Sequence, residues 1–251
     1  MAVPVVGVLH PGEMGAVVAA IARAEVLWAP EGRSAATAAR AEAAGLRPAP
    51  FEELVQRCDV LLSICPPHAA LDVARAVAGF RGVYCDANAV SPATAREVGA
   101  LMESAGASFV DGGIVGGPPT EPGTRLYLSG ERAGEIAALF AGTALEPIVL
   151  GAEPGTASAL KMCYAGWSKG SAALVIALAD AAAALGIADE LHAEWARSIP
   201  ELPARLERAR RSAASKGWRW VGEMEEIEAT LRSVGLPGGF HAAAADVYRR
   251  S

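Results

Sequence analysis

The stretch VVGVLHPGEMGAVVAAIA, residues 5–22, decides the fold expected of this chain. It begins as a short apolar strand, passes through a turn rich in glycine and proline, and ends as an alanine-rich helix. The fingerprint G-x-G-x-x-G keeps its last two glycines, Gly12 and Gly15, but His10 occupies the position of the first. Because phosphates bind at helix N-termini, we expect a variant cofactor loop here, in which His10 takes a turn position that suits glycine better. An ordinary tight strand-to-helix turn is the alternative.

Further along, short apolar runs alternate with alanine-rich helical stretches as far as about residue 150. This alternation is typical of βαβ units and predicts a doubly wound parallel sheet. The expected strands are 5–9, 25–28, 60–64, 82–85, 108–110 and 125–129, and the expected helices are 15–24, 34–44, 67–78, 91–106 and 131–140.

After Gly155 the strand pattern ends and only helical patterns follow. The expected helices are 156–185, with bends at Gly166 and Gly170, then 188–197, 202–215, 220–234 and 242–249. The predicted class is therefore α/β, with an N-terminal Rossmann domain over residues 1–152 and a smaller all-α domain over residues 153–251. The helix 156–185 is apolar nearly all round and must be buried on all sides, which predicts a homodimer that shares helices.

The composition excludes several functional classes. With 52% hydrophobic residues the chain is globular, and a net charge of −6 without a basic stripe argues against nucleic-acid binding. The N-terminus lacks the basic start of a signal peptide, and the longest apolar run, 171–185, is too short for a membrane span. The four cysteines show no metal-binding spacing, which indicates free thiols, no metal and a cytoplasmic location.

The segment WAPEGRSAAT, residues 28–37, lies where a Rossmann domain selects its cofactor. Arg33 followed by Ser34 suits a ribose 2′-phosphate, through the guanidinium fork and a hydroxyl at a helix start. Glu31 could instead chelate the ribose or cap the turn, and Arg33 could be a solvated surface charge. The segment favours NADP over NAD.

Six motifs in register resemble one family over the whole chain. GVLHPGEMG at 7–15 resembles the G-x-I-G-x-G-x-M-G opening of the β-hydroxyacid dehydrogenases, a superfamily with 3-hydroxyisobutyrate dehydrogenase, 6-phosphogluconate dehydrogenase and the imine reductases. The other five motifs are WAPEGRS (28–34), SICPPHAA (63–70), DANAVSP (86–92), DGGIVGG (111–117) and GTASALK (155–161). RWVGEMEEIEAT at 219–230 is similar to the C-terminal domain of phosphogluconate-dehydrogenase-like proteins.

The resemblance implies hydride transfer with a nicotinamide cofactor at an interdomain active site, a small-molecule substrate and a dimer. Lys161 matches the catalytic lysine of the family, a general acid toward the carbonyl oxygen in reduction and a base in reverse, with a pKa lowered by burial. Tyr164 is the second catalytic candidate. A lysine at a helix edge is the alternative for Lys161.

The same resemblance assigns binding residues. His10 could contact the cofactor pyrophosphate or point to solvent, and Asn88 and Ser91 could contact the nicotinamide ribose or substrate. Ser91 could instead cap the next helix, with Pro92 in its first turn. The cofactor set is His10, Pro11, Gly12, Glu13, Met14, Arg33, Ser34, Cys65, Pro66 and Asn88, and the substrate set is Ser91, Gly113, Val115, Gly116, Trp218 and Glu223.

Three polar substrate contacts of the family are changed here. Ala165 replaces an asparagine, Val115 replaces a serine, and Gly222, followed by Glu223, stands for a lysine. These changes point away from a small hydroxycarboxylate. Val115, Tyr164, Trp167 and Trp218 suit a larger or more apolar substrate, and Glu223 with Glu226 suits a cationic one, unless the two glutamates form a solvated helix face.

The sequence thus predicts an NADP-dependent oxidoreductase that interconverts a carbonyl and an alcohol. An imine reductase of the same fold is the first alternative, although Lys161 argues against it because imine reductases usually lack the lysine. A non-catalytic NADP-binding protein is the second.

Overall fold

The computed structural model describes residues 3–250, which divide into two compact units. The first unit ends at Lys161 and the second begins at Met162. The boundary lies inside one helix, α7 (Thr156–Ala184), nine residues after the expected boundary at 152/153. The first turns of α7 belong to the first unit because they are hydrogen-bonded to its sheet.

The first unit is built on an eight-stranded sheet in the order β3-β2-β1-β4-β5-β6-β7-β8. Neighbouring strands are parallel except β6 and β7, which are antiparallel. The order of the first six strands is that of a Rossmann sheet, so the predicted fold class is confirmed. The strands are β1 (Val5–Val8), β2 (Glu25–Trp28), β3 (Arg47–Pro48), β4 (Val60–Ser63), β5 (Val83–Asp86), β6 (Ser108–Val115), β7 (Thr124–Ser129) and β8 (Leu145–Gly151).

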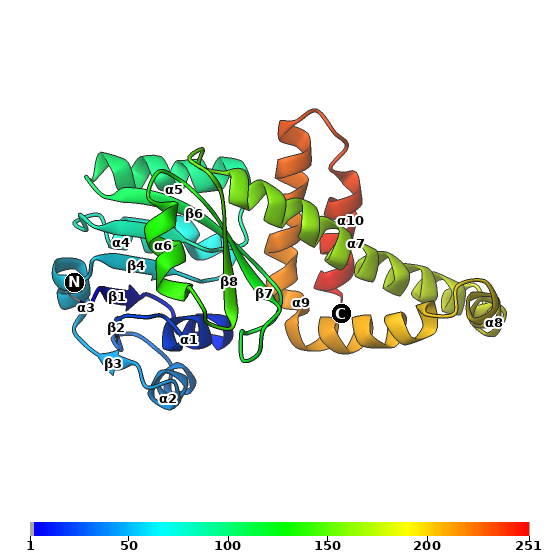
Figure 1. Ribbon diagram of the computed structural model, residues 1–251. Coiled ribbons are helices and arrows are strands. Elements are labelled where there is room, and N and C mark those ends of the chain that lie inside the picture. The colour runs from blue at the N-terminus through cyan, green and yellow to red at the C-terminus, as the bar shows by residue number, and fades with distance from the viewer. Residues whose placement is uncertain (1–2, 251) are drawn as a thin grey trace. The chain divides into compact units, whose positions relative to one another are not determined.

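Helices cover both faces of this sheet (Figure 1). Neighbouring residues of β4, Leu61 and Leu62, pack into opposite cores and are 0% and 2% exposed. Burying a leucine side chain stabilises the fold by about 1.5–3 kcal/mol, so both cores hold the sheet in place. One core receives α3 (Phe51–Arg57), α4 (Ala70–Ala76) and α5 (Pro92–Ser104), the other receives α1 (Glu13–Ala20) and α6 (Ala133–Phe140), and α2 (Ala35–Ala43) packs on a third cluster beside β2.

Three elements of the first unit were not expected from the sequence. The edge strand β8 contains Pro147, and its residues are mostly half-buried or exposed, so it lacks the apolar run of a central strand. Helix α3 has seven residues, and β3 has two. Strand β6 extends five residues beyond the expected 108–110, because Gly112 and Gly113 continue the ladder with β7.

The order in which strands are added to the sheet reverses at β1. Strands β2 and β3 extend to one side of β1, whereas β4 and those that follow extend to the other. In open parallel sheets, ligands bind at such a switch point, outside the carboxyl ends of the strands. The strands β1, β4 and β5 are parallel neighbours, so the loops that follow them lie at this edge.

The second unit is helical and contains the rest of α7 with α8 (Ala188–Ser198), α9 (Leu202–Ser233) and α10 (Gly239–Arg249). Helices α9 and α10 lie side by side, and α9 changes direction sharply along its length (Figure 1). The expectation of two helices, 202–215 and 220–234, is wrong because the helical hydrogen bonds continue through Gly217, which is buried. No helix within residues 3–250 is both long enough and apolar enough to span a membrane.

Candidate cofactor and catalytic site

The loop after β1 holds its two glycines for different reasons. A Cβ at Gly15 would lie 2.3 Å from the carbonyl oxygen of His10, so the close packing of α1 on the turn requires glycine there. A Cβ at Gly12 would meet no atom within 4 Å, although Gly12 directly precedes α1. The space at Gly12 is therefore open to a group from outside the chain, beside the N-terminus of α1.

His10 occupies the turn without strain. No non-glycine residue among residues 3–250 has a positive φ, so the expectation of an uncomfortable turn at His10 is wrong. The Gly12 N–H closes the turn by donating to the His10 carbonyl oxygen at 2.8 Å. The His10 Nδ1 is buried without a hydrogen-bond partner. Burial, with the nearby charge of Arg33, lowers the pKa of His10 to about 4. The ring is therefore neutral near pH 7.

Arg33 lies beside this turn. It is partly buried, and burial lowers the pKa of its guanidinium, so a fully solvated surface charge does not describe it. Its buried Nε has no hydrogen-bond partner. Ser34 caps α2 by accepting from the Thr37 N–H at 3.2 Å. Glu31 accepts from the Phe51 N–H at 3.3 Å, at the start of α3 and not within its own turn.

Asn88 links the ends of β4 and β5. Its Oδ1 accepts from the Cys65 N–H at 2.5 Å, and its Nδ2 donates to Ser63 Oγ at 3.0 Å. Its own N–H donates to Asp86 Oδ1 at 2.8 Å. Asn88 is 2% exposed, so its side chain fixes the loop after β4 from the inside.

Asp111 in β6 holds the start of α7. Its carboxylate accepts from the N–H groups of Gly155 and Ser158 at 2.9 and 3.0 Å, and from the Ser158 hydroxyl at 2.6 Å. The Ser129 hydroxyl donates a fourth hydrogen bond at 3.0 Å. A negative charge at a helix N-terminus is favourable, so Asp111 anchors α7 on the sheet.

This anchoring positions Lys161. A Cβ at Gly113 would lie 2.9 Å from the Ala157 carbonyl oxygen and 3.0 Å from Lys161 Cβ, so glycine lets α7 approach β6 closely. Lys161 Nζ donates to the Ile114 carbonyl oxygen at 2.6 Å. The ammonium group is thereby held at the end of β6 that follows Asp111.

The remaining predicted residues of the cofactor set lie in the loops after β1 and β4 or at the start of α1. Pro11 is buried, and its carbonyl accepts from Arg40 Nη1 at 3.4 Å, while Glu13 and Met14 open α1 and Pro66 precedes a 3₁₀ turn at Pro67–Ala69. Burial raises the pKa of the Cys65 thiol to about 12, so this thiol is not a nucleophile near pH 7.

Ser91 accepts from the Thr94 N–H at 3.2 Å as the cap of α5, with Pro92 in the first turn, so the capping alternative is confirmed. Val115 is 2% exposed and packs inside the unit. Gly116 has φ +127°, and a Cβ there would meet Thr124 Oγ1 at 2.6 Å.

In the second unit, predicted residues differ sharply in exposure. Tyr164, three residues after Lys161 on α7, is 48% exposed, and Trp218 is 65% exposed. Glu223 is 6% exposed and forms an ion pair with Lys169, so the solvated acidic face expected there is wrong. A buried carboxylate next to a lysine is already neutralised, and this pairing explains why Glu223 lies inside.

Two aromatic side chains complete this buried pair. Lys169 Nζ lies 5.7 Å from the ring centroid of Trp220, and Trp220 packs edge-on against Tyr248 at 5.1 Å. The Tyr248 hydroxyl donates to the Lys169 carbonyl oxygen at 2.6 Å. The ion pair and the two aromatic rings thus form one polar cluster inside the helical unit.

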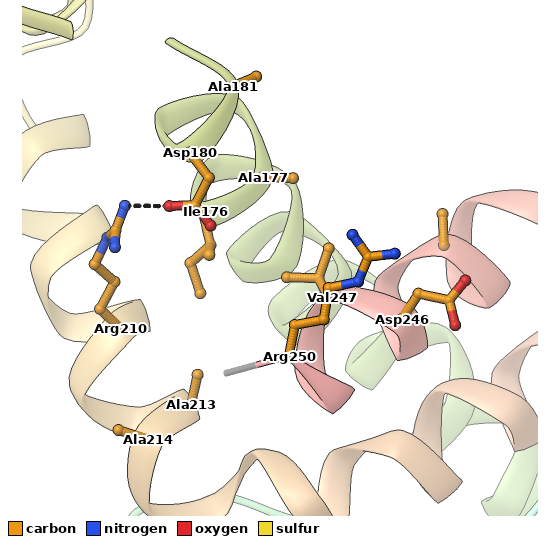
Figure 2. Close-up of a pocket in the computed structure, with 11 residues that line it drawn as sticks. Ile176, Ala177, Asp180, Ala181, Arg210, Ala213, Ala214, Asp246, Val247 and Arg250 are labelled. Carbon is orange, nitrogen blue, oxygen red and sulfur yellow. Dashed lines mark hydrogen bonds and ion pairs between the residues drawn. The ribbon is translucent and has the colours of Figure 1, made fainter. Parts of the chain in front are cut away.

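Two of the hollows in the helical unit are lined by none of Tyr164, Trp218 and Glu223, although Trp167 lines the second of them. One, of about 680 Å³, has alanine walls and a charged rim where Arg210 pairs with Asp180 at 2.6 Å (Figure 2). The other, of about 700 Å³, is an apolar groove between α7 and α10, with Trp167 and Phe240 70% and 80% exposed. Among residues 3–250, no group of three or more His, Cys, Asp and Glu side chains could hold a metal ion.

Sequence reasoning missed the positioning residues Asp86, Asp111, Arg40 and Lys169. Asp86 and Asp111 are the first residues of the motifs DANAVSP and DGGIVGG. A carboxylate that ends or follows an apolar strand run is a signal that could have identified them. Lys169 is one of three lysines in the chain, yet nothing in the sequence indicates its burial.

A Rossmann sheet with an open glycine turn at its switch point defines a dinucleotide-binding fold. The chain is 30% identical to a conserved protein of unknown function whose structure resembles 3-hydroxyacid dehydrogenases, over 98% of this chain and 96% of that one, with a TM-score of 0.71. It therefore belongs to the 3-hydroxyacid dehydrogenase-like superfamily, an oxidoreductase family, and the predicted resemblance is confirmed.

Other similarities agree with this family. An uncharacterized 28.5 kDa protein from Methanothermus fervidus is 31% identical over 172 residues, which are 67% of this chain and 66%, just under two thirds, of that protein. Residues 182–251 match a domain of unknown function, DUF1932.

Two more distant structures share the fold. A 3-hydroxyisobutyrate dehydrogenase from Salmonella typhimurium is 17% identical over 98% of this chain and 93% of that one, with a TM-score of 0.75. A reductive aminase from Aspergillus terreus, in complex with NADPH and ethyl levulinate, is 17% identical over 99% and 93%, with a TM-score of 0.62.

Proposed function

We propose that the protein is an NADP-dependent oxidoreductase that interconverts a carbonyl and an alcohol, with Lys161 as the general acid and base. The observation that carries this proposal is the Lys161 Nζ held 2.6 Å from the Ile114 carbonyl oxygen, on a helix anchored by Asp111. An ammonium group fixed in this way can donate a proton to a carbonyl oxygen and stabilise the alkoxide charge as it develops.

The cofactor assignment rests on the loop after β1. The open space at Gly12, beside the start of α1, fits a pyrophosphate, and bound NADPH supplies the hydride. Arg33 favours the 2′-phosphate, because Glu31, the competing ribose ligand, is already bonded to the Phe51 N–H. The distant reductive aminase of the same fold binds NADPH, which agrees with this assignment.

Binding and catalysis need separate tests. Tryptophan fluorescence titration with NADPH and NADH should give tighter NADPH binding, and Arg33→Ala should remove the preference. Lys161→Ala should lower kcat by about 10²–10⁴-fold on a carbonyl panel while NADPH binding persists. Lys216→Ala, which changes an exposed lysine, is the matched control. A wild-type protein that does not bind NADPH, or a Lys161→Ala protein with full activity, would overturn the proposal.

Imine reduction is the second candidate. Tyr164 is 48% exposed and follows Lys161 by three residues on α7, so its phenol is available as a proton donor. If imines are the substrates, Lys161→Ala retains turnover and Tyr164→Phe loses it. The opposite pattern supports carbonyl reduction.

We also propose that a second copy of the chain covers the apolar groove between α7 and α10. Trp167, Leu174 and Phe240 are 70%, 59% and 80% exposed there, and isolated soluble chains rarely leave such contiguous apolar surface in water. Light scattering should give a dimer mass for the wild-type protein and a monomer mass for Trp167→Glu/Phe240→Glu. A monomeric wild-type protein would contradict this pairing.

A further inference from the structure

Two buried carboxyl groups lie opposite each other at the carboxyl edge of the sheet. Asp86 ends β5, Asp111 lies in β6, and the two residues are register partners on parallel strands. Each is 1% exposed. Two buried carboxylates so placed disfavour simultaneous ionisation, so one of them retains its proton at higher pH than an isolated acid would.

Hydrogen bonds decide which of the two stays ionised. Asp111 accepts four hydrogen bonds, two from backbone N–H groups and two from hydroxyls. Asp86 Oδ1 accepts one, from the Asn88 N–H, and its buried Oδ2 has no hydrogen-bond partner. Donors stabilise a carboxylate, so Asp111 carries the charge and Asp86 is the group that holds a proton.

Among residues 3–250, no cation acts on the Asp86 carboxyl group. Asn88 and Asp111 are the polar groups that act on its carboxyl group, and burial is the main cause that raises its pKa to about 7, with a smaller contribution from Asp111. The Cys65 thiol, from the loop after β4, and Tyr84 and Cys85, from β5, lie near enough for the Asp86 charge to raise their pKa values.

Asp86 is connected to the loop after β4 through a single residue. The Asn88 N–H is bound to Asp86 Oδ1 at 2.8 Å, and the Asn88 side chain holds the Cys65 N–H at 2.5 Å and Ser63 Oγ at 3.0 Å. A change of charge on Asp86 therefore changes the acceptor that fixes Asn88, and Asn88 in turn fixes the backbone of this loop.

We propose that Asp86 is a proton-sensing positioning residue of the cofactor site: its deprotonation places a second negative charge there, which weakens cofactor binding, and changes through Asn88 the hydrogen bonds that fix the Cys65 loop. This inference rests on the cofactor proposed above. The direction follows from charge: a second buried carboxylate beside Asp111 repels the phosphates of a dinucleotide. The proton that leaves Asp86 goes to solvent. Because of the repulsion, NADPH binds best when Asp86 is neutral.

The link from Asp86 to the loop can be tested without cofactor. Carbon-detected NMR of the free protein should show the Asp86 carboxyl titrating near neutral pH, and the Cys65 amide signal should follow with the same midpoint. In Asp86→Asn, which keeps the shape and one acceptor oxygen, the Cys65 titration should disappear. An Asp86 midpoint below pH 5, or a Cys65 amide that does not follow it, would overturn the link.

The effect on binding is tested by NADPH titration from pH 6 to pH 8. Wild-type affinity should fall by about threefold to tenfold as the pH rises, the size of a partly screened charge interaction. Asp86→Asn should bind with little pH dependence, and Asp72→Asn, an exposed acid on α4, should behave as wild type. An unchanged slope in Asp86→Asn overturns the effect on affinity. Failure of the wild-type protein to bind NADPH at any pH overturns the proposed function instead, while the NMR titration still judges the link.

Discussion

The two units use polar side chains in opposite ways. In the first unit, Asn88, Asp111 and Lys161 are fixed by hydrogen bonds to backbone groups at the carboxyl edge of the sheet. In the second unit, the buried Lys169–Glu223 ion pair lies inside the helices, while Trp167 and Phe240 face outward. The sheet edge fixes polar groups by hydrogen bonds beside an open loop, whereas the helices bury an ion pair and expose apolar surface.

This difference teaches how to interpret a candidate residue. A polar side chain that is fixed by backbone groups beside an open loop is a candidate to contact a ligand. A polar side chain that is buried against a single opposite charge contributes to the stability of the fold. Glu223 belongs to the second kind, which argues against the substrate role predicted for it from the sequence.

The largest expected effect tests this interpretation of Glu223. Lys169→Met leaves the Glu223 carboxylate buried without its partner and should lower the free energy of unfolding by about 3–5 kcal/mol. The double variant Lys169→Met/Glu223→Leu should recover most of that loss. Urea unfolding followed by circular dichroism measures both.

An exposed pair provides the control. Arg211 and Glu207 form an ion pair on α9 with side chains 62% and 70% exposed, and Arg211→Ala should cost less than about 1 kcal/mol. If Lys169→Met is as stable as wild type and Glu223→Gln raises KM, Glu223 contacts the substrate after all, and the contrast between the units is lost.

A second prediction compares the two glycines of the cofactor loop. Gly15→Ala places a methyl group 2.3 Å from the His10 carbonyl oxygen and should lower the free energy of unfolding by about 2–3 kcal/mol. Gly12→Ala meets open space at an ordinary φ of −72° and should fold like wild type. It should nevertheless weaken NADPH binding by about tenfold, because the methyl group fills the space left for phosphate.

Thermal unfolding and fluorescence titration separate these outcomes. A Gly12→Ala protein that binds NADPH like wild type would mean that the phosphates lie elsewhere. A Gly15→Ala protein of unchanged stability would mean that the turn can move, and that the first unit is less rigid at this edge than its hydrogen bonds indicate.

Much of the first unit could be predicted because its signals are local. Glycine spacing and apolar runs mark the loop after β1 and the central strands, and Ser91 before Pro92 marks the start of α5. Edge strand β8 could not be predicted, because an edge strand needs neither an apolar run nor a free N–H at every residue, and Pro147 is tolerated there.

The polar partnerships could not be predicted, because they join residues distant in sequence. Asp111 and Ser158 are 47 residues apart, and Lys169 and Glu223 are 54 apart. Sequence pattern indicates which face of a helix is apolar, but which charge lies opposite which is set by the packing of whole elements. The Lys161 assignment came from a motif, and its hydrogen bond to Ile114 could be seen only in the folded unit.

The smallest expected effect concerns the pH dependence of stability at the sheet edge. Asp86 has a raised pKa of about 7, so its neutral form stabilises the fold, and this stability is lost as the pH rises from about 4 to about 7. His10 has a lowered pKa of about 4, so its contribution is present above about pH 6.5 and is lost as the pH falls toward 4. The two groups have opposite signs over one pH range, and in the wild-type protein they partly cancel.

Single variants should therefore reveal a pH dependence that the wild-type protein conceals. Relative to wild type, Asp86→Asn should gain about 1–3 kcal/mol in unfolding free energy between pH 4.5 and pH 7.5. His10→Gln should instead gain about 1 kcal/mol as the pH falls over the same range, a smaller effect because solvent screens a partly exposed ring. Urea midpoints at matched pH values measure both slopes. Parallel slopes in the two variants would show that the sheet edge does not balance an acid against a base.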